Sequence, residues 1–386
     1  MMPLGELCVR RIENVDPHHN PDKHFQYVDI SSIDNTRKLI TEPKLLLGRD
    51  APSRARISLR RGDVLVSTTR PNLNAVALVP EELHGQVAST GFCVLRALPD
   101  LLDQDFLFAF VQSSNFVEGL ADLVKGALYP AVNDSQVFSR LIPLPPLAEQ
   151  RRLAARLRGQ LTAVAEARAA LQAQLKAVAA LPAAYLREVF GAKASSLSRN
   201  RLGDVLRLRN DIAHPRDKPT GKTRFVGLEH IEPHTGRRIG EDSVQFEDLT
   251  GRKARFEKGD IVYGYLRPYL NKVWLADFAG ICSVDQYVYR VREDVADAAY
   301  VASFMRSPCY LTTAPTAATP GQLPRIRTEE VAKVLIPLPP LPEQRAIAAR
   351  LDDSFARVAT LRASLEARLA AVDRLPAALL REVFGG

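Results

Sequence analysis

The sequence lacks the short motifs that mark most nucleotide-hydrolysing, metal-dependent and nucleophilic enzymes. Gly221-Lys222-Thr223 has no preceding glycine at the spacing of a phosphate-binding loop, and HExxH, GxSxG and GxGxxG are all absent. No Asp/Asn-Pro-Pro-Tyr segment, the type shared by amino-methyltransferases, is found either. We therefore expect no catalysis from this chain alone.

Cysteine is scarce, and no long apolar run is present. The four cysteines form no CxxC pair, and the histidines at 18, 19 and 24 have no neighbours that would complete a metal site. No stretch approaches the ~18 apolar residues of a membrane span, and the N-terminal residues do not resemble a signal peptide. These absences predict free thiols in the reducing cytoplasm, with no bound metal and no membrane partner.

What the chain does have is positive charge, with a net charge of +8 that favours a polyanionic partner. The excess is unevenly placed, because residues 1–146 hold 15 lysines and arginines against 17 acidic residues. Local clusters, rather than the total, must therefore supply any nucleic-acid contact in this part.

The chain also repeats itself. LIPLPPLAEQRRLAARL at 141–157 returns as LIPLPPLPEQRAIAARL at 335–351, and LPAAYLREVFG at 181–191 returns as LPAALLREVFG at 375–385. Both matches have a period of 194 residues. A fixed period indicates two structural units, each a variable body followed by a nearly constant tail. The predicted boundaries are 1–144 and 192–338 for the bodies, and 145–191 and 339–386 for the tails.

The tails are predicted to be long helices with a coiled-coil seam. Alanine, leucine, arginine, glutamate and glutamine dominate, and apolar residues recur with heptad spacing. The seam positions are Leu157, Leu161, Val164, Leu171, Leu175 and Val178 in the first tail, and Leu351, Phe355, Val358, Leu365, Leu369 and Val372 in the second. Arg168 and Arg362 interrupt the seam, either fixing its register or extending from its edge. Pro182 is expected to end or kink the first helix, before a short helix from 183 to 190.

Two like seams in one chain predict antiparallel packing of the tails on each other. The 32 residues from 149 to 180 would give about 48 Å of helix. The alternative is that each tail packs only on its own body.

The bodies diverge, yet they align through RRGDVLVSTTRPNLNAVAL at 60–78 and EKGDIVYGYLRPYLNKVWL at 257–275. Alternating apolar residues after each Gly-Asp turn predict strands, and residues 106–116 and 300–310 are predicted to be short helices. The fold class is therefore α+β, with two pseudo-symmetric α/β domains separated by an antiparallel pair of long helices.

Two variable bodies, each closed by an I-P-L-P-P-L-x-E-Q helix, resemble the specificity subunit of type I restriction–modification systems. FQYVDISSIDN and GDVLVSTTRPNLNAVA also resemble the recognition domains of that family. The resemblance implies two target-recognition domains that each read half of a split DNA sequence, and helices that space them and dock two methyltransferase subunits. It places S-adenosylmethionine, ATP and magnesium in partner subunits, and adds restriction/translocase subunits through the complex.

Basic clusters in both bodies are candidates for phosphate contact. They are Lys44, Arg49, Arg54, Arg56, Arg60 and Arg61 in the first body, and Arg252, Lys253, Arg255 and Lys258 in the second. A solvated loop is the alternative.

Two loops in each body are candidates for groove contact, because arginine pairs with guanine and asparagine with adenine. Arg70, Asn72 and Asn74 align with Arg267, Tyr269 and Asn271. In a later loop, Lys125, Tyr129 and Asn133 align with Thr319, Leu323 and Arg327, and Gln322 and Arg325 add polar side chains beside them. Residues shared by two bodies that read different sequences are poor candidates for base reading. We therefore assign bases to Asn72 and Tyr269, and phosphates or the fold itself to Arg70 and Arg267.

Two other functions compete with DNA specificity. A coiled-coil adaptor would bind proteins with both bodies, and a cryptic nuclease would cut DNA with its own acidic metal site. DNA binding with steep salt dependence argues against the adaptor, and magnesium-dependent cutting by the isolated chain would indicate the nuclease.

Overall fold

The computed structural model describes the chain except residues 127, 192–197, 315–323 and 386. Contacts divide the chain into two compact units, and each unit combines a body with parts of both tails. The first unit is Met1–Leu171 with Arg368–Gly386, and the second is Gln172–Ala367. Each unit is described by itself.

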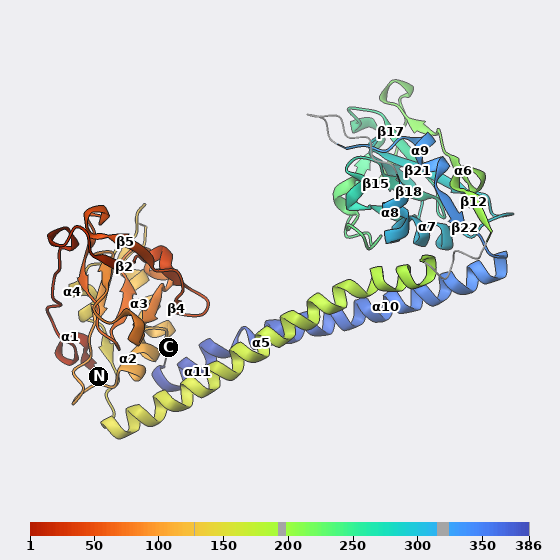
Figure 1. The fold of residues 1–386 in the computed structure, drawn as a ribbon. Helices are drawn as coiled ribbons and strands as arrows, with labels where there is room; N and C mark the ends of the chain where they lie inside the picture. Colours follow the sequence, from red (N-terminus) through yellow and green to blue (C-terminus); the bar gives the residue numbers. More distant parts are fainter. Residues whose placement is uncertain (127, 192–197, 315–323, 386) are drawn as a thin grey trace. The chain divides into compact units, whose positions relative to one another are not determined.

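The body of the first unit contains two main sheets (Figure 1). One has the strand order β5-β2-β9-β6 and the other the order β10-β7-β8, while β1 pairs with β11 and β3 with β4. The strands are β1 (Met2–Pro3), β2 (His24–Val28), β3 (Ile33–Asp34), β4 (Leu39–Ile40), β5 (Lys44–Leu47), β6 (Ala55–Ser58), β7 (Val64–Ser67), β8 (Val76–Leu78), β9 (Val87–Ser89), β10 (Phe92–Leu95) and β11 (Leu141–Ile142). The helices of this body are α1 (Leu4–Leu7), α2 (Gln104–Phe110), α3 (Ser114–Ala121) and α4 (Asp134–Phe138).

The body of the second unit follows the same plan. Its main sheets have the orders β13-β21-β18-β19 and β14-β17-β20-β15-β16, and β12 pairs with β22. The strands are β12 (Arg199–Arg201), β13 (Leu206–Leu208), β14 (Ile212–Ala213), β15 (Lys222–Val226), β16 (Asp242–Gln245), β17 (Lys253–Phe256), β18 (Ile261–Gly264), β19 (Val273–Leu275), β20 (Gly280–Cys282), β21 (Gln286–Val291) and β22 (Leu335–Pro337). The helices are α6 (Leu202–Val205), α7 (Ala298–Arg306), α8 (Pro308–Thr313) and α9 (Thr328–Lys333).

The Gly-Asp turn before each predicted strand is present in both bodies. Gly62 and Gly259 have φ of 83° and 89°, a region that glycine adopts without steric cost. The next residue, Asp63 or Asp260, is buried and forms an ion pair of 2.7 Å with Arg96 or Arg209. Strands β7 and β18 then begin where the alternating pattern predicts.

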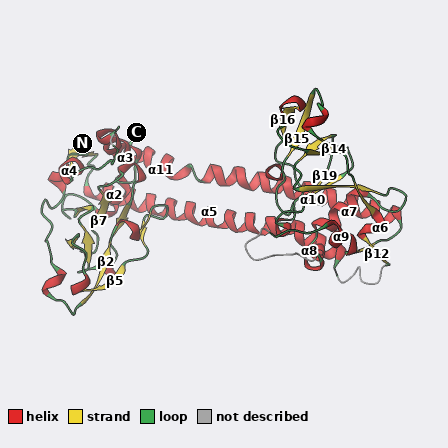
Figure 2. Ribbon diagram, turned by 90° about the horizontal axis from the view of Figure 1, so that it is seen from above, coloured by secondary structure: helices red, strands yellow, loops and turns green. Residues whose placement is uncertain are grey.

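The tails form two long helices, α5 (Leu147–Phe190) and α10 (Leu341–Val372), followed by α11 (Leu375–Phe384); both long helices are visible in Figure 2. Together with the sheets of the two bodies, they confirm the predicted α+β class. The separate short helix predicted from 183 to 190 is not formed, because α5 continues through Pro182 to Phe190 and does not end at the proline. Only the second tail breaks before its proline.

The local sequence explains this difference. Ala179 and Ala180 precede Leu181-Pro182, whereas Asp373 and Arg374 precede Leu375-Pro376. Alanine is the best helix former and can carry the helix through a proline, while aspartate has a lower helix propensity. Residues 373 and 374 form a turn, and Pro376 lies in the first turn of α11, where its missing N–H costs nothing.

Burial along both helices follows the predicted heptads. Each seam position between 157 and 178, and between 351 and 372, is buried or half-buried. The positions between them are exposed, with the exception of the half-buried Ser354. This pattern fits a narrow coiled-coil stripe rather than the broad face of a helix packed on a globular core.

The end of each tail completes the core of the body from the other repeat. In the first unit, the ring of Phe384 from α11 lies 5.1 Å from Phe106 and 5.5 Å from Phe110. In the second unit, Phe190 at the end of α5 lies 5.3 Å from Tyr300 and 5.4 Å from Phe304. The alternative that each tail packs only on its own body is therefore wrong.

The beginning of each tail is attached to its own body by a buried glutamine. The Gln150 amide donates to the carbonyls of Leu101 and Pro145 and accepts from the Asp103 N–H, at 2.9–3.0 Å. Gln344 makes the same three bonds to Val295, Pro339 and Asp297. Both side chains are 1% exposed, so each amide is buried and matched in its hydrogen bonds. This requirement explains the Glu-Gln of the repeated phrase.

Candidate nucleic-acid interface

The Arg-Pro-x-Leu-Asn segment forms the same unusual turn in both bodies. In the first body, a one-turn 3-10 helix, Pro71–Leu73, is flanked by Arg70 and Asn74 with φ of 48° and 46°. In the second, Pro268–Leu270 is flanked by Arg267 and Asn271 with φ of 53° and 46°. Left-handed backbone costs a non-glycine residue about 1–2 kcal/mol, and asparagine tolerates it best. The shared residues therefore shape the turn, as the fold-based alternative predicted.

The second predicted loop is attached to this turn in each body. The Arg70 N–H donates to the Pro130 carbonyl at 2.8 Å, and the Arg267 N–H donates to Pro324 at 2.8 Å. The bridges Thr69–Ala131 and Leu266–Arg325 extend both contacts. The structure thus brings together two segments that are about 60 residues apart in the sequence, and each body presents them as one surface.

In the first body, most of the predicted side chains on this surface are exposed. Arg70, Asn72, Lys125 and Tyr129 all face solvent, whereas Asn74 is half-buried and its carbonyl accepts a bond from the Lys38 ammonium at 2.6 Å. Asn133 is exposed, but its side-chain oxygen accepts from the Gln136 N–H and caps α4. The side-chain oxygen of Asn133 therefore has a structural role.

In the second body, one assignment must be corrected. Asn271 is fully buried, and its amide donates to the Arg306 carbonyl at 2.9 Å, so it is not available to DNA. Tyr269 is 54% exposed at the tip of the turn. Arg325 and Arg327 are also exposed, while Gln322 lies outside the described residues.

A stacked tyrosine pair lies beneath the surface of the second body. The rings of Tyr265 and Tyr287 are 4.4 Å apart. Burial and the Asp285 carboxylate raise the pKa of the Tyr265 hydroxyl, while the charges of Arg325 and Arg252 oppose that rise. Two arginines and one aspartate therefore act on the same hydroxyl, which the sequence pattern did not predict. Exposed arginines are what phosphate contact requires.

The basic cluster of the first body is mostly paired with acids. Lys44, Arg49, Arg56 and Arg61 form ion pairs with Asp29, Asp22, Asp16 and Glu81, respectively. Among the residues that the structure describes, Arg54 and Arg60 have no ion pair. Phosphate contact by the paired residues would require exchange of a carboxylate for a phosphate.

The cluster is also divided between two ends of the body. The Arg54 carbonyl accepts from Thr90, and Gly91 accepts from Thr68, so Arg54 lies near the Arg70 turn. Arg60 and Arg61 precede β7, at the end opposite to that turn. Arg54 therefore lies at the end of the body that carries the surface formed by the two loops, whereas Arg60 and Arg61 do not.

The basic segment of the second body shows a similar mixture. Arg255 pairs with Asp211 at 3.6 Å and lies over the Phe246 ring, and the Lys253 ammonium lies 5.0 Å from the Phe225 ring. Arg252 and Lys258 are exposed.

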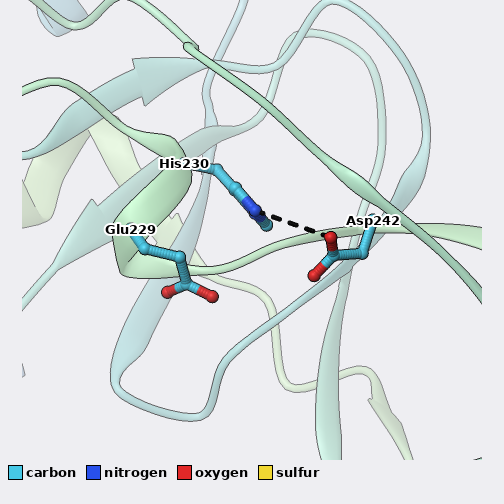
Figure 3. Close-up of side chains that lie close together, drawn as sticks. All are labelled: Glu229, His230 and Asp242. Carbon is cyan, nitrogen blue, oxygen red and sulfur yellow. Dashed lines mark ion pairs between the residues drawn. The ribbon is translucent and has the colours of Figure 1, made fainter. Parts of the chain in front are cut away.

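A cluster of Glu229, His230 and Asp242 resembles a metal site in its composition (Figure 3). The His230 Nε2 lies 3.8 Å from an Asp242 oxygen. However, the His230 Nδ1 accepts a hydrogen bond from the Gly227 N–H at 3.1 Å. In the neutral ring, Nε2 must then carry the proton and cannot bind a metal. The cluster is better explained as the His230 ring closing the turn at Leu228–His230, with the Asp242 carboxylate near its Nε2.

Four arginines at the start of the first tail form ion pairs within the first unit. Arg151 and Arg158 pair with Asp103 and Asp105 of the body, Arg152 pairs with Glu149, and Arg156 pairs with Glu382 of α11. The pairs of Arg151, Arg156 and Arg158 link α5 to its neighbours, whereas the pair of Arg152 lies within α5.

The fold and the repeated turn define a protein with two related bodies, each with an exposed loop surface that differs at its tip, joined to long helices. Among solved structures, the chain is similar to the HsdS subunit from Thermoanaerobacter tengcongensis, with 32% identity, a TM-score of 0.67 and coverage of 100% of this chain and 96% of that chain. It is also similar to a chain in a structure of the assembly and conformational transition of the type I R-M system, with 32% identity, a TM-score of 0.83 and coverage of 100% and 97%. The chain therefore belongs to the specificity subunits of type I restriction–modification systems.

Comparison with curated proteins agrees. The type I restriction enzyme EcoDI specificity subunit of Escherichia coli is 31% identical over 186 residues, which are 48% of this chain and 41% of that subunit. The HindI specificity subunit of Haemophilus influenzae is 24% identical over 107 residues, 27% of this chain and 23% of that protein. The matches thus span less than half the length of these two relatives. No family model matches the chain. No helix in the described part of the chain is long and apolar enough to cross a membrane.

Proposed function

We propose that this chain gives a type I restriction–modification complex its DNA sequence specificity and catalyses nothing by itself. The observation that supports this most directly is the turn after β7 and β18. Its frame is the same in both bodies, whereas the exposed tip residue is Asn72 in one and Tyr269 in the other. A common frame with different tips suits two readers of the same polymer that recognise different bases.

The target proposed is an asymmetric sequence in two halves with an unread gap. The exposed arginines beside each turn, Arg70 and Arg267, would contact phosphates and orient the body. Asn72 would form paired hydrogen bonds with a base edge, and Tyr269 would supply a ring and a hydroxyl. Because the tips differ, we expect the two half-sequences to differ as well.

The paired helices are proposed to set the length of the gap and to dock two methyltransferase subunits. The continuous 44-residue helix α5, with a seam buried along its length, has the regularity that a spacer needs. S-adenosylmethionine, ATP and magnesium would be bound by partner subunits, and restriction/translocase subunits would join through the complex. We propose that the protein is located in the cytoplasm, because its DNA partner is there.

Methylation-sensitive sequencing of the genome of cells that carry the intact system would identify the target. We expect one motif with two unlike halves. Replacing residues 1–140 with the first body of another family member should change one half and leave the other half and the gap unchanged. A motif that changes in both halves, or in neither, would contradict the assignment of one half to each body.

The complex with its methyltransferase partner should also bind its target duplex with a steep salt dependence. Each phosphate contact contributes a slope of about −0.9 in a plot of log K against log salt. Binding without such a slope would contradict the phosphate contacts.

A further inference from the structure

The first body exposes two large apolar side chains next to each other on the surface formed by its two loops. Leu128 is 88% exposed and Tyr129 is 84% exposed, more than any other large apolar residue in the described part of the chain. Single exposed apolar residues are common on protein surfaces, but an adjacent pair exposed to this extent indicates a contact site.

The pair stands on a rigid base. Pro130, which follows it, accepts the 2.8 Å bond from the Arg70 N–H, and Ala131 forms a bridge with Thr69. Val132 donates to the Thr68 carbonyl at 2.8 Å and is 6% exposed in the core. The two side chains therefore project from the same base that holds the Arg70 turn, while their own surfaces remain uncovered.

The charges around the pair indicate the kind of partner. Arg70 and Lys125 are exposed on the same two loops and have no ion pair within the described residues, while Asp122 and Asp134 are the nearby acids in the sequence. A partner must therefore offer negative charge beside flat apolar surface. Duplex DNA offers both, with phosphates outside and the faces of its bases inside. An apolar protein surface would not use the two cations.

We propose that Leu128 and Tyr129 form a wedge that enters between two neighbouring base pairs of the first half-target. Apolar side chains that enter a base step unstack it and bend the duplex, and aromatic rings stack on the exposed base. Arg70 and Lys125 hold the phosphates on either side. This inference rests on the proposed function, since it specifies how the first body contacts DNA.

The second body lacks this pair in its sequence, because Gln322 and Leu323 stand at the aligned positions. A polar glutamine does not gain from entering a base stack. The distortion is therefore confined to the half-target that the first body reads, and that asymmetry makes the proposal testable.

The test uses the complex of the full chain with its methyltransferase subunits and duplexes that carry the identified target. 2-Aminopurine, whose emission rises when it is unstacked, replaces one base at a time in both halves, except the base that the complex methylates. The wild type is compared with the double variant Leu128→Ala/Tyr129→Ala. A matched control is Leu45→Ala, which removes a 67% exposed leucine from β5 of the same body.

We expect the wild type and Leu45→Ala to raise the emission at one step of the first half and at none of the second. The double variant should lose this rise while its dissociation constant increases no more than about tenfold. Tyr129→Phe should keep the rise, because stacking needs the ring and not the hydroxyl. Thermal unfolding of the double variant should match that of the wild type, since both side chains are exposed.

Three results would overturn the wedge. The wild type could give no rise in the first half, the rise could persist in the double variant, or the double variant could fail to assemble with methyltransferase subunits in the absence of DNA. The last result would make the pair a protein-docking site. If the wild-type complex did not bind the duplex at all, the proposed function itself would fail, which is a separate outcome.

Discussion

The two units attach their bodies to the helices by some contacts that are repeated and some that are not. The buried amides of Gln150 and Gln344 make the same three hydrogen bonds in each unit. Phe384 and Phe190 also enter the two bodies in the same way. These repeated contacts are buried and uncharged.

The contacts that differ are charged and closer to solvent. Arg168 pairs with Asp373 at 2.8 Å, between the two tails, whereas the equivalent Arg362 pairs with Glu232 of the body at 3.4 Å and with Glu366 of its own helix. The seam arginines therefore do not share one role. Since the buried contacts alone are common to both units, we infer that they determine the architecture, and that the charged contacts adapt it to each body.

A second charged contact of the first unit has no equivalent in the second, where the aligned helix residue carries the opposite charge. Arg158 of α5 pairs with Asp105 in the first unit, whereas Asp352 of α10 and Ala299 stand at the aligned positions. Asp352 instead lies near Arg306, whose pKa is lowered to about 10 by burial, against the opposing effect of Asp352. Ala299, Arg306 and Asp352 line a cavity of about 630 Å³ between the second body and α10, within one unit.

The strongest test of the repeated contacts is removal of their aromatic rings. We expect Phe384→Ala and Phe190→Ala each to destabilise one unit by about 3–5 kcal/mol, because a buried ring is lost and a cavity remains. Hydrogen exchange should show faster opening of β7 for Phe384→Ala and of β18 for Phe190→Ala. The exposed Glu188→Ala on α5 serves as the control. Equal loss of protection in both units from either variant would contradict separate anchoring.

The glutamines should give the next largest effect. Gln150→Ala leaves one N–H and two carbonyls without partners in a buried place, and we expect a loss of about 2–3 kcal/mol. Gln344→Ala should cost the same amount in the second unit. The control is the exposed Gln172→Ala on α5, with an expected change within about 0.5 kcal/mol. Unequal effects of the two buried variants would show that the repeated contact is not equivalent in energy.

These contacts also show what the sequence could predict. Heptad spacing predicted the seam, because a helix places every third and fourth residue on one side whatever it packs against. Repetition of LREVF did not predict that Phe190 and Phe384 each complete the core of the other repeat's body. Periodicity is a local property, whereas the choice of partner depends on where the chain returns in space.

The sequence predicted where the candidate interface lies, but not what each of its residues does. The pattern identified both loops of each body, yet Asn74 and Asn271 look alike in the sequence while only Asn271 is fully buried. Ion pairing of Lys44, Arg49, Arg56 and Arg61 was also missed, since their acidic partners lie 15 to 40 residues away. A proline alone did not predict where the first helix ends, because α5 continues through Pro182 to Phe190.

Substitutions at the tips of the two turns test how the two bodies differ. We expect Asn72→Ala to relax discrimination at one base pair of the first half by about 1–3 kcal/mol, and Tyr269→Ala to act only on the second half. Binding competition among duplexes with single substitutions would measure both effects. Arg70→Ala is the contrasting variant, because loss of a phosphate contact should weaken all sequences alike and reduce the salt slope by about 1.

The smallest effects should come from the charged seam pairs. Double-mutant cycles of Arg168 with Asp373, and of Arg362 with Glu232, should each give about 0.2–1 kcal/mol at low salt, because these side chains are partly exposed. In 1 M salt, where the screening length is about 3 Å, both should fall towards zero. Replacement of Arg362 alone should affect the second unit and leave protection of the first unchanged.

The dependence of stability on acid pH should distinguish these two pairs further, because Glu232 takes part in only one of them. Burial raises the pKa of its carboxyl, but hydrogen bonds from Arg237 and Thr235 lower it more, so that the pKa lies below the ordinary value. Stability from a depressed carboxyl pKa is complete above the ordinary value and is lost as the pH falls through the depressed one. Glu232→Gln should therefore flatten the acid limb of stability in the second unit only. An unchanged acid limb would mean that the charge of Glu232, and with it the ion pairs to Arg237 and Arg362, contributes nothing to stability that protonation can remove.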